Sequence, residues 1–275
     1  MAWVAVALSM ATTPLRAQGS SADPNLGNLK LTSGFDVTNA YLFRGIPQDD
    51  TGVIMWPYAD LGITLHHGDG ALKNVGVNVG MWNSLHTGLA GLDGLGKLWY
   101  ESDFYATLAL GLGKGTSLGV TYTAYNSPNS GFVPVKEVSF KFAMDDSGPL
   151  GRYASKPYVI VARELEGQAD AGTKEGTYLE LGAAPSISLW RVGVAVPLRL
   201  GLSLADYYEG ASGDERFGFF SVAGVATVPF SSRPTRFGSW NVHGGVEFVT
   251  LGDRNEAILG ERTKVIGSVG IGLSY

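Results

Sequence analysis

The chain contains no cysteine, few charged residues and no long apolar run, and each shortage excludes a class of protein. Without cysteine it forms no disulfide framework, thiolate nucleophile or cysteine-ligated zinc site. Charged residues make up only 16% of the chain, well below the quarter typical of soluble domains. No apolar run reaches the roughly 20 residues that a membrane-spanning helix needs. The net charge of -5, with no basic run, argues against a nucleic-acid partner.

Glycine and short alternating stretches dominate what is present. Glycine accounts for 39 of 275 residues, about twice its usual share. Apolar and polar side chains alternate with a period of two, as in a β-strand, and clusters of Gly, Asn, Asp, Ser and Pro separate these stretches. The twelve expected strands cover residues 29–45, 52–65, 73–83, 98–112, 116–126, 134–144, 156–165, 176–186, 191–205, 217–229, 237–249 and 264–275.

The two faces of these strands differ in a way that favours a membrane barrel over a soluble β-sandwich. On residues 191–205, Val and Leu share one parity, while the other parity carries Arg, Gly, Ala and Pro. The polar parity throughout carries little charge and much Gly, Ala, Ser and Thr, as the wall of a lumen does. Even strand number and alternating longer and shorter connections are typical of bacterial outer-membrane barrels. We therefore expect an all-β fold, a transmembrane antiparallel up-and-down β-barrel of twelve strands, with ten as the alternative.

The pattern divides the chain into a leader, a short polar segment and the barrel. Residues 2–11 have the length of the apolar region of a signal peptide, and small residues before Gln18 suit cleavage after Ala17. No Lys or Arg precedes the apolar run, so the true start can lie upstream of Met1. We expect a signal peptide at 1–17, a polar lead-in at 18–28 and the barrel at 29–275, located in the outer membrane of a Gram-negative-type envelope.

The last stretch, residues 264–275, reads as the strand that closes the barrel. Its apolar parity ends on Tyr275, and aromatic side chains anchor spans at membrane interfaces. An even strand count requires the first and last strands to pair in antiparallel fashion. We expect Tyr275 to be a periplasmic interface anchor, with outer-membrane lipid and, through this terminal strand, the barrel-assembly machinery as partners.

Charged residues of mixed sign fall on the inward parity and are the candidate pore lining. Such charges either select ions in a wet lumen or pair across the barrel and close it. The candidates are Asp36, Arg44, Asp60, Glu101, Asp103, Lys141, Glu180, Arg199, His243 and Glu247. His243 and Glu247 share the inward face, which leaves open a hydrogen bond in the lumen or half of a metal site, although two ligands are too few for a metal ion.

The motifs of enzymes and nucleotide-binding proteins are incomplete. Residues 91–98, GLDGLGKL, nearly form a phosphate-binding loop, but Leu98 stands where Ser or Thr is needed. His86 is expected in a loop, and no His-x-Ser pair of an outer-membrane phospholipase and no GxSxG elbow occurs. We expect no enzyme activity, no cofactor and no metal.

The stretch SGFDVTNAYLFRGIPQ, residues 33–48, is the most distinctive in the chain. Phe35, Val37, Tyr41 and Phe43 are expected to face lipid, and Asp36 and Arg44 to face the lumen. The stretch resembles the opening strand of the TorF family of outer-membrane porins, with matches at Tyr41, Phe43, Arg44, Gly45 and Gln48. Ala40 and Pro47 replace residues that are Asp and Ser in the family. The resemblance implies an outer-membrane barrel and no mechanism.

Together these features predict a porin-like channel for passive diffusion of small hydrophilic solutes or ions. The main alternative is a non-conducting outer-membrane barrel whose surface loops serve adhesion or a structural role. An outer-membrane enzyme that modifies lipid and a soluble periplasmic β-sandwich are the further alternatives.

Overall fold

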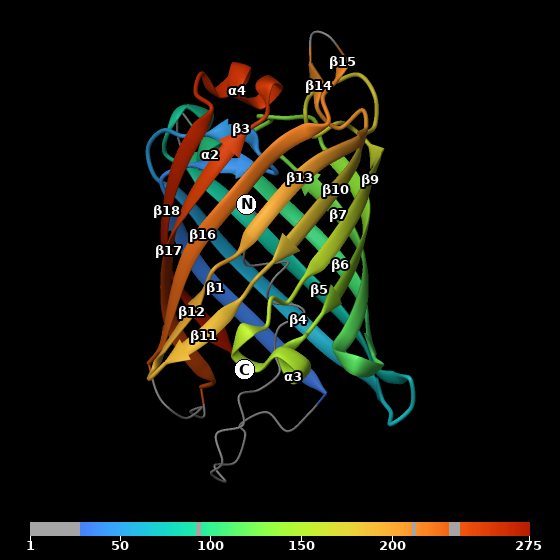
Figure 1. The fold of residues 1–275 in the computed structure, drawn as a ribbon. Coiled ribbons are helices and arrows are strands. Elements are labelled where there is room, and N and C mark those ends of the chain that lie inside the picture. Colours follow the sequence, from blue (N-terminus) through green and yellow to red (C-terminus); the bar gives the residue numbers. More distant parts are fainter. Residues whose placement is uncertain (1–27, 92–94, 211–212, 231–236) are drawn as a thin grey trace.

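A computed structural model describes residues 28–91, 95–210, 213–230 and 237–275. The expected signal peptide and residues 18–27 of the lead-in lie outside these ranges. The described chain forms a closed antiparallel barrel of 12 strands (Figure 1), as the sequence predicts. Its strands are β1 (Leu29–Thr38), β4 (Ile54–His67), β5 (Leu72–His86), β6 (Trp99–Leu112), β7 (Thr116–Asn126), β8 (Val135–Met144), β9 (Tyr158–Glu166), β10 (Thr177–Ala183) continued by β11 (Ser186–Leu189), β12 (Val192–Ala195) continued by β13 (Leu198–Ala205), β16 (Phe217–Pro229), β17 (Ser239–Leu251) and β18 (Thr263–Ser274).

Two of the barrel strands are interrupted at prolines. Pro185 separates β10 from β11, and Pro197 separates β12 from β13. Proline lacks the N–H that a sheet ladder needs, so it breaks a strand locally. The neighbouring Val196 N–H still donates to the carbonyl of Pro185, at 2.9 Å. The breaks therefore divide each strand into two pieces while the barrel wall continues past them.

The first and last strands close the barrel. β1 pairs with β18 in antiparallel register, with Phe35 opposite Ile271 and Val37 opposite Val269. Tyr275 and Leu31 exchange two backbone hydrogen bonds of 2.8 Å each. The expected pairing of the first and last strands is thus confirmed.

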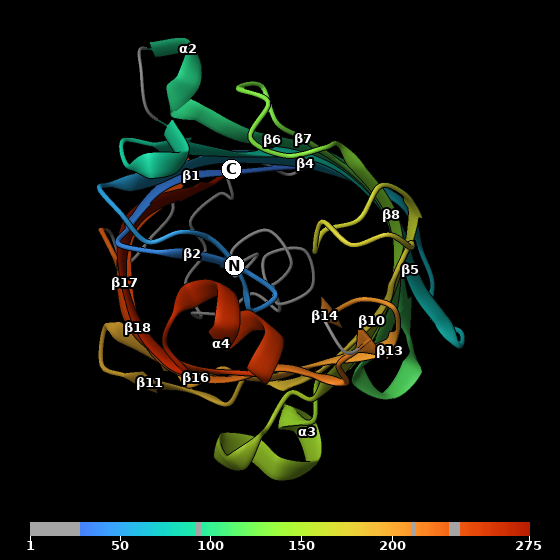
Figure 2. The same cartoon turned by 90° about the horizontal axis from the view of Figure 1, so that it is seen from above.

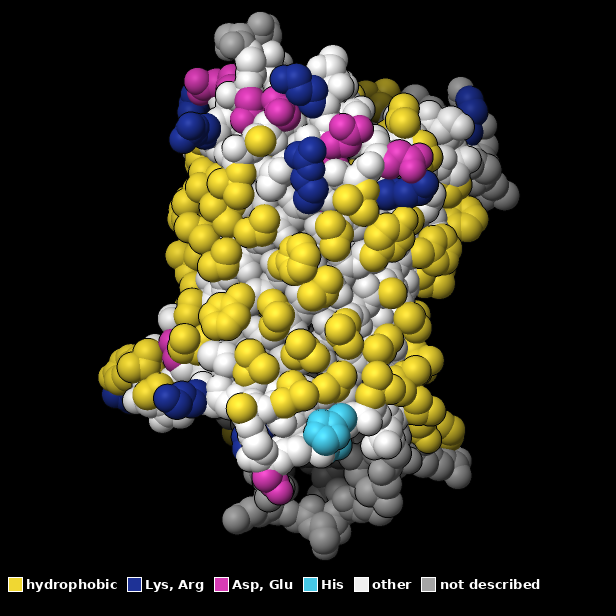
Figure 3. Space-filling view, turned by 90° about the vertical axis from the view of Figure 1, so that its right-hand side faces the viewer, with side chains coloured by type: hydrophobic (Ala, Val, Ile, Leu, Met, Phe, Trp, Pro, Cys, Tyr) yellow, Lys and Arg dark blue, Asp and Glu magenta, His cyan; other side chains and the backbone are white. Residues whose placement is uncertain are grey.

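An apolar band surrounds the outside of the barrel. Side chains such as Phe104, Phe140 and Phe248 are about half exposed on the outer face, and Figure 3 shows apolar side chains over the middle of the wall with charges concentrated above and below. Along each strand the opposite parity points into the lumen, because successive side chains of a strand alternate between its faces. Among the described residues, no helix is long and apolar enough to cross a membrane.

The connections differ between the two ends of the barrel. The end at the top of Figure 1, here called the loop end, carries two small hairpins and α4. Seen from above, α4 and β2 lie across the mouth, whereas α2 and α3 lie outside the wall (Figure 2). The short elements are β2 (Tyr41–Phe43), β3 (Ile46–Asp49), β14 (Glu209–Gly210), β15 (Gly213–Asp214), α2 (Leu95–Leu98), α3 (Ser147–Leu150), α4 (Asp253–Leu259) and the 3₁₀ turns η1 (Leu89–Gly91), η2 (Gly113–Gly115) and η3 (Gly151–Tyr153).

Two expectations about facing are wrong. β1 ends at Thr38, and the chain then turns into the lumen, so Tyr41 is 2% exposed instead of facing lipid and Phe43 packs on Tyr125 inside the barrel. In β6, strict alternation from Phe104 predicts that Tyr100 faces lipid and Trp99 faces the lumen, but Tyr100 is 6% exposed and Trp99 43% exposed. The cause is a shift of register between Ser84 and Leu85 where β5 pairs with β6. Such a bulge exchanges the two faces of the residues beyond it.

Candidate functional site in the barrel lumen

A two-stranded hairpin, β2 and β3, folds into the barrel from the loop end. Its turn consists of Arg44 and Gly45, which both have positive φ, 50° and 81°, the pattern of a type I′ turn between paired strands. A Cβ added to Gly45 would lie 2.8 Å from the Cβ of Phe219 on the wall. Glycine is therefore required there, both for the turn and for the close approach to β16. We call residues 41–49 the plug.

Aromatic side chains pack the plug against the wall. The ring of Tyr41 lies 5.6 Å from that of Trp56 and 5.5 Å from that of Trp82, between ring centroids. Trp56 and Trp82 are 2% and 6% exposed. Such aromatic contacts are each worth about 0.5–1.5 kcal/mol beyond the area they bury. The lumen at the loop end is thus occupied by a small apolar core.

A chain of polar contacts also joins the plug to the wall. Asp49 Oδ2 lies 2.9 Å from His86 Nδ1, and His86 Nε2 lies 2.7 Å from Ser84 Oγ. Trp56 Nε1 donates to the same Ser84 Oγ at 2.9 Å. The order of atoms is that of a serine–histidine–aspartate triad. The expectation that His86 lies in a loop is wrong. β5 is longer than expected and extends to His86, which is its buried last residue.

Arg44 at the tip of the plug is enclosed by a carboxylate and aromatic rings. Its Nη1 and Nη2 donate to the two carboxylate oxygens of Glu137 on β8, at 2.6 and 2.8 Å. Nη1 also donates to the hydroxyl of Tyr207, at 2.7 Å, and the guanidinium carbon lies 4.3 Å from the ring centre of Tyr178. Burial works against the charged form, but Glu137 and Tyr207 outweigh it and raise the pKa of Arg44.

Two buried carboxylates lie on β6 beside this enclosure. Glu101 and Asp103 are 4% and 6% exposed, and Asp103 pairs across the sheet with Tyr125, whose hydroxyl donates to Glu137 at 3.4 Å. Asp103 Oδ1 is shielded from solvent and has no hydrogen-bond partner in the described part of the chain. Burial, followed by the charges of Glu101 and Asp103, raises the pKa of Tyr41 on the plug.

Two contacts join inward-facing polar side chains of different strands. His243 Nε2 lies 2.7 Å from Asp36 Oδ1, and His243 Nδ1 lies 2.9 Å from Asn241 Oδ1. Arg199 Nη2 donates to Glu247 at 2.6 Å. A hydrogen bond between His243 and Glu247 was one expectation, but Nε2 of His243 contacts Asp36 on β1, and Glu247 contacts Arg199 on β13. In each case one strand lies between the two partners. Strands two apart in a sheet are roughly 10 Å apart, which is less than the roughly 13 Å between residues four apart on one strand.

Towards the other end, the turn end, the lumen is polar. Asp60 accepts hydrogen bonds from Asn78 at 2.8 Å and Tyr105 at 3.1 Å. A cavity of about 200 Å³ lies here, and its lining includes Lys30, Asp60 and Asn78. Water and small polar solutes can be accommodated by a cavity with this lining.

The remaining predicted lumen residues, Glu180 and Lys141, meet at Tyr158. Glu180 accepts hydrogen bonds from the hydroxyls of Tyr158 at 2.8 Å and Tyr178 at 2.6 Å. The ammonium of Lys141 lies 4.7 Å from the ring centre of Tyr158. Within the residues that the structure describes, no group of three or more His, Asp or Glu side chains is placed to hold a metal ion.

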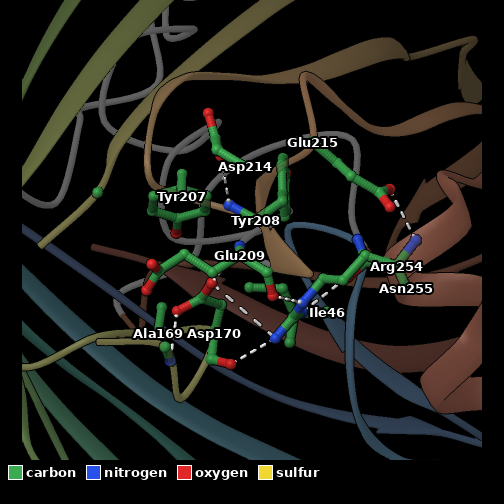
Figure 4. A network of polar contacts seen from close by, with 12 residues as sticks. Ile46, Ala169, Asp170, Tyr207, Tyr208, Glu209, Asp214, Glu215, Arg254 and Asn255 are labelled. Carbon is green, nitrogen blue, oxygen red and sulfur yellow. Dashed lines mark hydrogen bonds and ion pairs between the residues drawn. The ribbon is translucent and has the colours of Figure 1, made fainter. Parts of the chain in front are cut away.

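Arg254 on α4 ties the connections of the loop end together (Figure 4). Its Nε donates to the carbonyl of Glu209 at 3.1 Å, its Nη2 to the carbonyl of Asp170, and its backbone N–H to Glu215 at 2.8 Å. The N–H of Glu209 donates to Asp170 at 2.7 Å. Burial lowers the pKa of Arg254 and raises that of Asp170. These contacts hold α4 over the barrel mouth.

Several residues of the site escaped the candidate set. Glu137 lies on the inward parity of residues 134–144, but nothing in the sequence distinguishes it from other charged residues, and Tyr207, Asp49 and Ser84 carry no sequence signal. The one available signal was Arg44–Gly45 flanked by apolar residues, since a Gly after a polar residue between two short strands indicates a two-residue hairpin. That signal would have placed Tyr41 and Phe43 on a separate hairpin.

Comparison with known proteins supports the architecture. No protein-family model matches the chain, and no curated protein matches it in sequence. Among solved structures, an outer-membrane channel from Pseudomonas putida aligns over 94% of this chain and 100% of its own, with a TM-score of 0.52 and 11% identity. The fold is that of an outer-membrane β-barrel.

Other outer-membrane barrels align less well. Outer membrane phospholipase A from Escherichia coli covers 90% of this chain and 92% of its own, with a TM-score of 0.43 and 10% identity. The translocator domain of the autotransporter NalP from Neisseria meningitidis covers 98% and 92%, with a TM-score of 0.43 and 10% identity. A fold does not by itself determine function, which must be argued from the residues of the lumen.

Proposed function

We propose that this outer-membrane barrel is a channel for passive diffusion of small hydrophilic solutes or ions, and that cations enter it more readily than anions. The polar cavity at the turn end, lined by Lys30, Asp60 and Asn78, is the observation that carries the proposal. A wet, charged lumen passes solutes and selects them by sign. Of the ten candidate lumen residues, six are Asp or Glu and three are Lys or Arg, and this excess of carboxylates favours cations.

The plug limits conduction in this proposal. The aromatic cluster around Tyr41 and the contacts of Arg254 close the loop end, so the channel passes solutes when the plug moves. The same closure favours the alternative function, a non-conducting barrel whose surface loops serve adhesion or a structural role. The two functions differ in what happens when the plug is removed.

Planar-bilayer recording of the refolded protein tests the proposal. Wild type should show small or brief openings, and a variant in which residues 41–48 are replaced by a Gly-Ser linker should show larger and steadier ones. A salt gradient across the bilayer should give a reversal potential of the sign expected for cations. Absence of conductance in both proteins would exclude the channel and favour the surface role.

The cellular setting is part of the proposal. The fold agrees with a location in the outer membrane. In this proposal residues 1–17 are a signal peptide that is cleaved off, and the barrel-assembly machinery inserts the chain through the strand that ends at Tyr275. The resemblance of Tyr41, Phe43, Arg44, Gly45 and Gln48 to the TorF porins supports a porin role.

We also propose that the chain is not an enzyme. Asp49, His86 and Ser84 have the atom order of a triad, but Ser84 and His86 are both fully buried, and Trp56 donates to the hydroxyl that would act as nucleophile. A nucleophile must be reachable by its substrate at a distance of roughly 3 Å. These residues are better suited to holding the plug.

A further inference from the structure

The groups that surround Arg44 form a complete recognition site for a planar cation. Glu137 supplies two parallel acceptors, Tyr207 supplies a third oxygen, and the ring of Tyr178 lies over the guanidinium at 4.3 Å. A carboxylate in this two-pronged geometry and an aromatic face are the features by which proteins select guanidinium over ammonium. Glu137 and Tyr178 belong to the wall, and Tyr207 to the connection after β13, so these three groups lie outside the plug.

Arg44 is held in this site at a conformational cost. Its φ of 50° lies in the left-handed region, which non-glycine side chains other than Asn and Asp seldom adopt. Such a backbone persists only where surrounding contacts hold it. The contacts here are those of the guanidinium with Glu137, Tyr207 and Tyr178 and the hydrogen bond of 2.9 Å from the Tyr208 hydroxyl to the Arg44 carbonyl. Occupancy of the site and the shape of the plug therefore depend on each other.

The surroundings favour a positive charge even without the plug. Glu137 is 2% exposed, and Asp103 and Glu101 are nearly as buried two strands away on β6, which corresponds to about 10 Å. Asp103 Oδ1 has no hydrogen-bond partner among the described residues. If Arg44 left, Glu137 would lack its partner, and an unpaired buried carboxylate is strongly unfavourable.

We propose that the enclosure formed by Glu137, Tyr178 and Tyr207 is a guanidinium-binding site, that Arg44 fills it as an internal ligand, and that solutes carrying a guanidinium group compete with Arg44 for it. Displacement of Arg44 releases the tip of the plug. One consequence of this inference, that guanidinium solutes favour the open channel, rests on the proposed channel function. The binding itself does not require conduction.

The test uses the full-length protein refolded in detergent, with Arg44→Gly as the vacant variant. Glycine adopts positive φ without strain, so this substitution empties the site while keeping the turn. Arg44→Asn is the second variant, because Asn-Gly is a preferred type I′ pair and the short amide does not span the site. Heat-modifiable gel mobility confirms that each variant is folded before it is used.

Isothermal titration calorimetry with methylguanidinium is the binding measurement. Arg44→Gly should bind it, wild type should bind it at least roughly tenfold more weakly because Arg44 competes, and methylammonium should bind the variant roughly tenfold more weakly than methylguanidinium. Adding Glu137→Gln to Arg44→Gly should abolish binding. Three results would overturn the proposal. Arg44→Gly could bind methylammonium as tightly as methylguanidinium, wild type could bind methylguanidinium as tightly as Arg44→Gly does, or neither folded variant could bind it.

Bilayer recording then separates this inference from the channel function. In wild type, methylguanidinium should raise the open probability because it displaces Arg44. In Arg44→Gly, whose site is already vacant, it should instead reduce the current by occupying the lumen, and it should leave the current of Arg44→Gly/Glu137→Gln unchanged. If calorimetry shows selective binding and no protein conducts, the site stands and the channel proposal fails. If the proteins conduct and calorimetry shows no selective binding, the channel stands and the site fails.

Discussion

Arg44 and Glu137 are 93 residues apart in the chain and meet in the lumen through two hydrogen bonds of 2.6 and 2.8 Å. The contact joins the tip of the plug to strand β8. The position of the plug therefore depends on a charge of the barrel wall. Substituting either residue tests how much this contact stabilises the plug.

Glu137→Gln should lower the free energy of unfolding by roughly 3 kcal/mol, because it leaves the buried Arg44 guanidinium without its counter-charge. Urea unfolding in lipid vesicles measures the change. The double variant Glu137→Gln/Arg44→Gly should lose less free energy of unfolding than the sum of the losses of the two single variants, since both substitutions remove the same ion pair. The control is Glu166→Gln, which breaks the exposed pair with Lys136 and should leave the unfolding midpoint unchanged.

Arg199→Glu should move ion selectivity further towards cations. The substitution replaces the partner of Glu247 with a second carboxylate in the lumen, and adjacent negative charges attract cations and repel anions. The reversal potential in a salt gradient measures the shift. Arg152→Glu makes the same charge change on an exposed residue of η3 and should have little effect. An unchanged reversal potential in Arg199→Glu would exclude Arg199 from the conduction path.

Acid should loosen the loop end. Although burial works against ionisation, hydrogen bonds from Thr51 and His86 lower the pKa of Asp49 in the plug, and those from Thr173 and Lys174 lower the pKa of Glu209. A carboxyl whose pKa is lowered by folding stabilises the fold above its unfolded pKa and loses that contribution as the pH falls through its folded pKa. We expect the protection of the backbone amides of residues 41–49, measured as hydrogen exchange relative to the intrinsic rate at each pH, to fall below about pH 4. In Asp49→Asn this protection should already be low at neutral pH.

A fluorophosphonate probe should leave Ser84 unlabelled in the folded protein. Its hydroxyl is fully buried beneath the plug and already accepts from Trp56. Intact-mass spectrometry after incubation measures labelling. Ser84→Ala should lower stability, because Trp56 and His86 each lose a buried partner, at about 1–3 kcal/mol per unsatisfied group. Labelling that disappears in His86→Ala would show instead that these residues form a working triad.

Deleting Tyr275 should impair assembly of the barrel. Its backbone exchanges two hydrogen bonds with Leu31 across the closing seam, and its side chain is 42% exposed at the end of β18, where an aromatic ring suits the membrane interface. The folded fraction recovered in the membrane, assayed by heat-modifiable mobility, measures the effect. Tyr275→Phe keeps the backbone bonds and the ring, so it should assemble nearly as well as wild type.

The sequence by itself determined the strands and their closure. The period of two is a local property of strand geometry, and turn residues mark where each strand ends. For this reason the twelve stretches, the pairing of β1 with β18 and the inward parity of residues such as Asp36 and Glu247 could be predicted from the sequence. Membrane thickness limits strand length, which further restricts the assignment.

Only the tertiary structure decided which of these inward side chains meet. Asp36 contacts His243 and Arg199 contacts Glu247 because strand register sets the height of each residue in the lumen, and register depends on pairing along the whole barrel. It also decided that Tyr41 and Phe43 leave the wall. Their alternation continues that of β1, but the positive φ of Arg44 and the space beside Phe219 and Glu137 allow the segment to enter the lumen. Both outcomes depend on contacts between residues far apart in the chain, which a local pattern does not contain.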